Sequence, residues 1–173
     1  IAQLVAFNFP KRCKSLTSVM STSGNPNLPR SSKKIIEGLN RQPATSNKKD
    51  VIENNLITRK LWASPKFPTS EVILKENFSH RYDRMYYPEG LTRQYAAIGG
   101  DGDRSQRLQK ISVPTLVLHG ASDNLVPVEA GIDTKRNILG SKIEILEGWG
   151  HDLPEGTHAW IIDKLYNHIK SNN

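Results

Sequence analysis

Cysteine is nearly absent from this 173-residue sequence, in which Cys13 is the only one. A single thiol cannot form a disulfide within the chain, and it cannot supply a zinc site built from several cysteines. A lone thiol is compatible with a reducing compartment, so we expect a cytoplasmic protein. The five histidines lack metal-ligand spacing, and we therefore expect no metal site and no cofactor.

Long apolar runs are missing as well. No window approaches the roughly 18 consecutive apolar residues that a membrane span needs, so we expect no membrane span. The apolar segment IAQLVAFNFP, residues 1–10, lacks the basic flank and cleavage site of a signal peptide. It resembles a buried helix whose beginning has been removed, and the chain does not begin with Met. We therefore expect a fragment that lacks an N-terminal part.

The sequence also lacks a long run of one charge, although its formal net charge is +7. Lysine and arginine occur in short pairs, at positions 11–12, 33–34 and 48–49. No aromatic residues interleave with these pairs at the spacing that base stacking needs. We interpret the basic residues as solvated surface and expect no nucleic-acid partner.

Composition divides the chain into residues 1–24, 25–107 and 108–173. In the first region, IAQLVAF has apolar residues at helical spacing, and SLTSVMST predicts a buried strand. The last region predicts, in order, a strand at 114–120, a helix at 127–140, a strand at 142–148 and a helix starting at Thr157. This order is typical of an α/β fold with right-handed crossovers and a mostly parallel sheet.

The middle region, residues 25–107, contains prolines that separate several short helical patterns. The pattern at 69–87 has Ser70 as its expected N-cap, and the pattern at 88–98 begins with a proline. The glycine-rich segment 99–105 predicts a connection. Because no strand pattern is convincing here, we expect a helical insertion.

Two polar loops follow the predicted strands, HGASDNLVPVE at 119–129 and EGWGHDLPEG at 147–156. Because the carboxyl ends of parallel strands meet at one edge of a sheet, an acid on one loop can meet a base on the other. We expect Asp123 to accept a hydrogen bond from Nδ1–H of His151. Nε2 of His151 would then act as general base and later as general acid. A carboxylate suits the first role because it stays ionised, and histidine suits the second because it titrates near neutral pH.

Each of these residues also has a structural interpretation. Asp123 could serve only a turn, and His151 could bond only to the backbone. Asp152 is a rival for the acid, although adjacent side chains usually diverge. His119 closes the predicted strand at 114–120 and is interpreted as structural. The other histidines on helical patterns are His80, His158 and His168.

These motifs resemble a known family. VPTLVLHGASDNLVPVEAG at 113–131 and GWGHDLP at 148–154 are similar to the C-terminal third of the α/β-hydrolase fold. In that family the acid loop has the form H-G-x-x-D-x-x-V-P, and the histidine loop has the form G-x-G-H. Asp123 matches the acid and His151 matches the base, and the order of acid before histidine also agrees. The first 22 residues resemble the helix and strand that follow the nucleophile elbow.

The middle region resembles the helical lid of one bacterial subgroup, notably in YPEGLTRQYAAI at 87–98. That subgroup is similar to aclacinomycin methylesterase-type carboxylic ester hydrolases. The resemblance implies a Ser-His-Asp triad, a small apolar ester as substrate and no cofactor. It also implies a pocket under the lid, and the candidate residues for lining it are Trp62, Tyr82, Tyr86 and Tyr87.

The sequence departs from the family because it contains no G-x-S-x-G motif. Ser122 lies in the acid loop, and the serines from Ser15 to Ser23 lie on or after a strand without glycine flanks. We therefore expect the nucleophilic serine and the oxyanion-hole donors upstream of Ile1, and we expect the 173-residue chain alone to be inactive.

Other activities of the same fold stay open. An upstream aspartate as nucleophile would indicate haloalkane dehalogenation or epoxide hydrolysis, and hydrolysis of C–C bonds is a further alternative. An elbow without a nucleophile would indicate a non-catalytic relative that binds a small apolar ligand. Short motifs specify neither the acyl and alcohol groups nor the oligomeric state.

Overall fold

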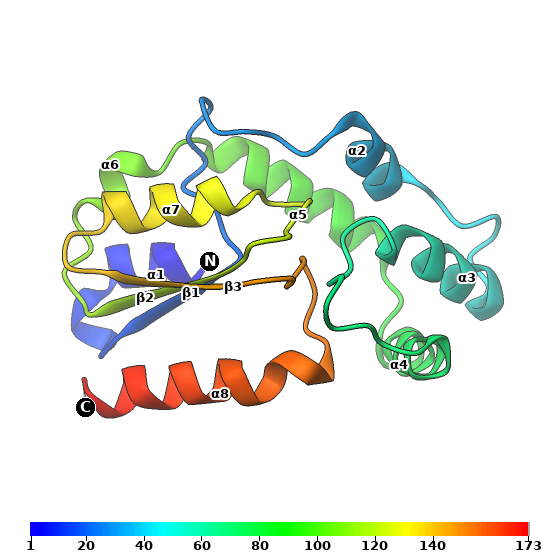
Figure 1. Cartoon of the computed structure of the whole chain (residues 1–173). Helices are drawn as coiled ribbons and strands as arrows, with labels where there is room; N and C mark the ends of the chain where they lie inside the picture. The colour runs from blue at the N-terminus through cyan, green and yellow to red at the C-terminus, as the bar shows by residue number, and fades with distance from the viewer. Residues whose placement is uncertain (173) are drawn as a thin grey trace.

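The computed structural model describes residues 1–172, and its centre is a parallel sheet of three strands (Figure 1). The strands are β1 (Leu16–Val19), β2 (Thr115–Gly120) and β3 (Lys142–Leu146), in the order β1-β2-β3. Leu16 pairs with Thr115, and Val117 pairs with Ile143. The predicted α/β class with a parallel sheet is confirmed.

Helices cover both faces of this sheet. Helices α1 (Ala2–Asn8) and α7 (Val128–Asn137) lie on one face, and α8 (Glu155–Lys170) lies on the other (Figure 1). All six residues of β2 are buried because both of its faces are covered, which explains its continuous apolar run. By contrast, no residue of β3 is fully buried, because this strand lies at an edge of the described sheet.

Two apolar clusters form the core, one on each face. The first cluster combines residues of α1, β1, the segment before β2 and the residue just after α7. Its members are Ala6, Leu16, Leu108, Ile111 and Ile138. The second lies under α8 and consists of Leu116, Leu118, Trp149 and Ile161. Because Trp149 belongs to the histidine loop, this core supports that loop directly.

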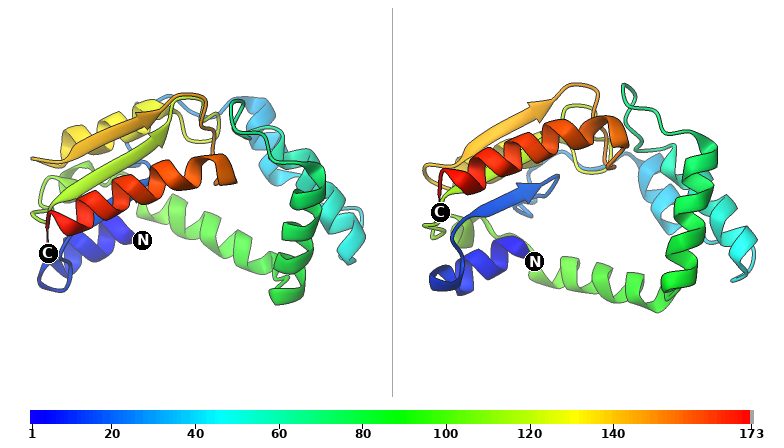
Figure 2. Two further views of the ribbon diagram at one scale, coloured as in Figure 1. Left: turned by 60° about the horizontal axis from the view of Figure 1, so that its bottom comes forward. Right: turned by 90° about the horizontal axis from the view of Figure 1, so that it is seen from below.

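Four helices lie within residues 25–107, all of which the structure describes: α2 (Lys33–Asn40), α3 (Lys48–Arg59), α4 (Glu71–Arg84) and α5 (Pro88–Asp101). They lie beyond the carboxyl ends of the strands (Figure 2). The Ser70 side chain accepts a hydrogen bond from Ile73 N–H and caps α4, as predicted. Within the described residues, no helix has the length and apolar character needed to cross a membrane.

Two predicted boundaries are wrong. The predicted connection at 99–105 is helical as far as Asp101, because Arg104 and Arg107 bind the Asp101 carboxylate at 2.6 and 2.7 Å and hold the last turn. A short helix, α6 (Ser105–Leu108), then follows. Thr157 is not the cap of α8. The helix begins at Glu155 with Pro154 as its N-cap, and the Thr157 hydroxyl donates to Pro154 O within the first turn.

Candidate active site

The loop after β2 holds Asp123 in a turn that leaves one carboxylate oxygen available. Oδ1 accepts hydrogen bonds from Leu125 N–H at 2.9 Å and Val126 N–H at 2.7 Å. The residue is only 5% exposed. Oδ1 of Asp123 therefore has the turn role that the sequence allowed, and Oδ2 takes no part in the turn. Two backbone donors on one oxygen fix the direction in which the other oxygen presents its lone pairs.

His151 meets that second oxygen. Its Nδ1 lies 2.7 Å from Asp123 Oδ2, a distance typical of a charge-assisted hydrogen bond. The carboxylate is fully buried, whereas the imidazole is 28% exposed. With Nδ1 donating to the carboxylate, Nε2 is left as the acceptor on the exposed side of the ring. This is the arrangement that a histidine general base requires.

Two glycines shape the histidine loop. Gly148 has a φ of +78°, in the left-handed region that side chains rarely adopt. Gly150 approaches the chain so closely that a Cβ there would collide with the backbone of Trp62 and Ala63. Trp149, between them, is fully buried, and its Nε1–H donates to Asp152 O at 2.6 Å.

Asp152 was the alternative candidate for the acid, but its carboxylate bonds to other residues than His151. Its carboxylate binds Arg59 at 2.7 Å and also accepts from Ser64 N–H at 3.2 Å. Arg59 is the last residue of α3, and Ser64 lies in the segment after it. The two neighbouring side chains therefore diverge, as expected.

His119, the last but one residue of β2, is fully buried beside the acid. Its Nε2–H donates to Val126 O at 2.8 Å, and Nε2 lies 3.6 Å from Asp123 Oδ2. Burial lowers the pKa of His119, because a charged imidazole would lose its hydration there. The neutral ring thus holds the turn that carries Asp123.

This lowered pKa predicts that the chain loses stability as the pH falls below about 6.5, the ordinary value for histidine. The unfolded chain then takes up a proton that folded His119 does not. The free energy of unfolding should be measured by urea denaturation between pH 8 and pH 5. His119→Gln retains an N–H donor for Val126 O but does not titrate. Below about pH 6.5, this variant should reduce the slope of the free energy of unfolding against pH by up to about 1.4 kcal/mol per pH unit. An unchanged slope would show that His119 does not contribute to the pH dependence of stability.

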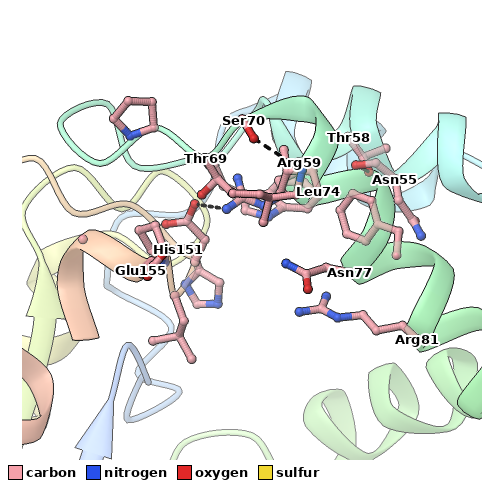
Figure 3. Close-up of a pocket in the computed structure, with 18 of the residues that line it drawn as sticks. Asn55, Thr58, Arg59, Thr69, Ser70, Leu74, Asn77, Arg81, His151 and Glu155 are labelled. Atoms are coloured by element: carbon pink, nitrogen blue, oxygen red, sulfur yellow. Dashed lines mark hydrogen bonds and ion pairs between the residues drawn. The ribbon is translucent and has the colours of Figure 1, made fainter. Parts of the chain in front are cut away.

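A pocket of about 1030 Å³ opens beside the exposed edge of His151. The histidine loop and the start of α8 form one wall, and α3 and α4 form the other (Figure 3). Asn77 and Arg81 project from α4 into the space opposite His151 (Figure 3). The apolar part of the lining includes Ile73, Leu74, Phe78 and Leu153.

Of the four aromatic residues proposed for a pocket, Trp62 lines this one, whereas Tyr82, Tyr86 and Tyr87 do not. Tyr82 stacks on Tyr86 with ring centroids 4.9 Å apart, and its hydroxyl donates to Ser46 O. The pocket-facing stripe of α4 contains residues 70, 73, 74, 77, 78 and 81. A residue at 82 lies off this stripe, and 86 and 87 follow the end of the helix.

The sequence analysis missed Arg59, Ser64, Asn77 and Arg81. The helical spacing of Ser70, Asn77 and Arg81 was a usable signal for a polar stripe on α4. No comparable signal marks Ser64, which lies in a short proline-containing segment after α3.

The chain is similar in sequence to curated hydrolases. No family model matches the chain. It is 26% identical over 155 residues to the 2-hydroxy-6-oxononadienedioate/2-hydroxy-6-oxononatrienedioate hydrolase of Klebsiella pneumoniae, covering 85% of this chain and 51% of that protein. It is 28% identical over 158 residues to a Pseudomonas putida protein of the same name, numbered 1, covering 85% of this chain and 52% of that protein. The chain therefore spans about half the length of the curated relatives it matches.

Solved structures share the fold. A meta-cleavage product hydrolase from Pseudomonas fluorescens superposes with a TM-score of 0.75 at 14% identity, covering 99% of this chain and 61% of that one. An enol-lactonase from Burkholderia xenovorans gives 0.71 at 14% identity, covering 98% and 61%. A putative lipase from Acinetobacter baumannii gives 0.67 at 21% identity, covering 98% and 58%.

Proposed function

We propose that this chain, which has the C-terminal portion of the α/β-hydrolase fold, supplies the acid and the base of a carboxylic ester hydrolase. The observation that carries the proposal is the 2.7 Å contact between His151 Nδ1 and the buried Oδ2 of Asp123. It leaves Nε2 on the exposed side of the ring, at the edge of the pocket, where His151 is one of the lining residues. Helices α2–α5 act as a lid over this pocket.

In the proposed reaction, a serine N-terminal to Ile1 attacks the ester carbonyl. His151 Nε2 takes the hydroxyl proton, and the Asp123 carboxylate stabilises the imidazolium that forms. The same Nε2–H then protonates the departing alcohol, which leaves an acyl-serine. His151 next takes a proton from the water that attacks the acyl carbon, and it returns this proton to the serine oxygen as the acid is released. Donors for the oxyanion would come from the elbow and an earlier strand loop.

A second candidate is hydrolysis of a C–C bond in an acidic substrate. Both curated relatives are named for a dioate, which carries two carboxylates. Arg81 and Asn77, opposite His151, offer a cation and an amide for one such group. The same acid and base would serve this reaction, and the difference would lie in the substrate that the pocket holds.

The test compares the 173-residue chain with the protein read from the DNA that includes the codons upstream of Ile1. We expect the longer protein to hydrolyse p-nitrophenyl acetate and the shorter chain to leave it intact. Faster turnover of 2-hydroxy-6-oxononadienedioate would favour the second candidate. Ester turnover by the shorter chain that is lost on His151→Ala would place the nucleophile within it and contradict the proposal.

A further inference from the structure

The histidine loop is held by a second set of contacts that the catalytic proposal does not use. Its partner is the α3–α4 linker, defined here as residues 60–70, together with Arg59 at the end of α3. His151 N–H donates to Trp62 O at 2.8 Å. At the other end of the loop, Lys66 N–H donates to Gly148 O at 3.2 Å. The loop that carries the base is therefore bonded to the linker at both of its ends.

Ser64 is the central residue of this contact and is only 4% exposed. Its Oγ accepts from Gly150 N–H at 2.9 Å and donates to the carboxylate of Asp152. One hydroxyl thus bonds to the residues immediately before and after His151. With the Trp62 carbonyl on His151 itself, three consecutive residues are attached to the linker. Removing the hydroxyl leaves Gly150 N–H and Asp152 Oδ1 without the partner that each has here, although Oδ2 of Asp152 keeps its own.

Arg59 completes the attachment through an ion pair. Its guanidinium lies 2.7 Å from Asp152 Oδ2, and the two side chains are 16% and 6% exposed. Arg59 reaches from α3 toward the histidine loop (Figure 3). A pair this buried is unfavourable to break, because little solvent is available to the remaining charge in place of its partner. Charge therefore fixes the loop to α3 as well as to the linker.

We propose that Asp152 and Ser64 are positioning residues that hold the His151 ring in register with Asp123 by fastening its loop to the lid. Asp123 fixes one end of the imidazole, and the linker fixes the backbone from which the ring extends. A displacement of about 1 Å at a catalytic group can cost about 100-fold in rate. A lid that moves away from the sheet would carry the base with it, so lid position sets the activity of the site. The catalytic part of this inference rests on the proposed function.

Nuclear magnetic resonance of the 173-residue chain with ¹⁵N-labelled histidine tests the geometry without any reaction. We expect the Nδ1 proton of His151 to exchange with water about tenfold faster in Ser64→Ala and in Asp152→Asn, the effect of losing one or two net hydrogen bonds. Asp152→Asn removes the charge and turns one of the two accepting oxygens into a donor. Ser64→Ala keeps the Arg59–Asp152 pair intact and serves as the second variant should the first fold poorly. Wild-type exchange rates in both variants would overturn the proposal.

Asp83→Asn is the control for a contact elsewhere in the lid. It breaks a Lys48–Asp83 ion pair of 2.6 Å that joins α3 to α4 but does not touch the histidine loop. This variant should leave the exchange rate of the His151 Nδ1 proton unchanged. Faster exchange would overturn the proposal, because it would show that the loss of any contact within the lid has the same effect. In the longer protein, Ser64→Ala should lower kcat about tenfold with KM unchanged, as weaker positioning predicts. If exchange quickens but no hydrolase activity exists, the proposed function fails while the positioning of the ring by the linker stands.

Discussion

Replacing Asp123 with asparagine is expected to lower kcat about 10⁴-fold in the protein that carries the nucleophile, with little change in KM. Asparagine fills the same space, but its amide does not carry the charge that stabilises a protonated His151. It can also donate to Nδ1, which favours the wrong tautomer. The buried Oδ2 at 2.7 Å from Nδ1 is the group that this substitution changes. Steady-state kinetics on p-nitrophenyl esters measure the effect.

Asp133→Asn provides the control for this experiment. Asp133 is 6% exposed, close to the 5% of Asp123, and its carboxylate binds Ser23 and Asn137, away from the site. Its replacement should affect stability but leave kcat within about twofold, because its carboxylate contacts neither the reacting groups nor the histidine loop that positions them. Wild-type kcat in Asp123→Asn, or an equal loss in both variants, would remove Asp123 from the catalytic mechanism.

The pairing of Asp123 with His151 was accessible from sequence because it follows from topology. Both residues stand in loops after strands of a parallel sheet, and such loops share one edge. The two residues are 28 positions apart, and the segment between them consists of the acid loop, one helix, one strand and the start of the histidine loop, a complete crossover unit. No knowledge of side-chain packing was needed, since the backbone order alone brings the loops together.

The attachment of Asp152 to Arg59 and Ser64 could not be predicted in this way. Ser64 and Asp152 are 88 positions apart, on segments with no shared periodicity. This contact forms only because the α3–α4 linker lies against the histidine loop after α3 and α4 have packed. A sequence pattern describes the face of one element, whereas this contact needs the relative placement of two. The position of Tyr82 off the pocket-facing stripe of α4 has the same origin.

Asp123 illustrates how a structural and a catalytic role coincide in one residue. Oδ1 caps the turn that His119 also holds through Val126 O, and Oδ2 binds His151. The turn fixes the carboxylate plane, so the acid is oriented before any substrate arrives. A sequence interpretation that treats turn residue and catalytic acid as alternatives therefore separates two functions that the fold combines.

Trp149→Ala is expected to lower the free energy of unfolding by about 3–5 kcal/mol, the range for removing a buried tryptophan. The side chain is fully buried among Leu116, Leu118 and Ile161, and its ring meets Trp160 edge to face with centroids 5.9 Å apart. Leu116 and Leu118 are held by the sheet, which limits how far the surrounding side chains can collapse into the space. Urea denaturation of the 173-residue chain measures the loss.

Trp149→Phe separates packing from hydrogen bonding at this position. Phenylalanine keeps most of the apolar contact but lacks the Nε1–H that donates to Asp152 O at 2.6 Å. We expect a smaller loss of about 1–3 kcal/mol, mostly from the carbonyl left unpaired. Because Trp149 O also accepts from Ser122 N–H in the acid loop, both variants should loosen the Asp123–His151 contact. A loss below about 1 kcal/mol in Trp149→Ala would show that the core under α8 does not support the histidine loop.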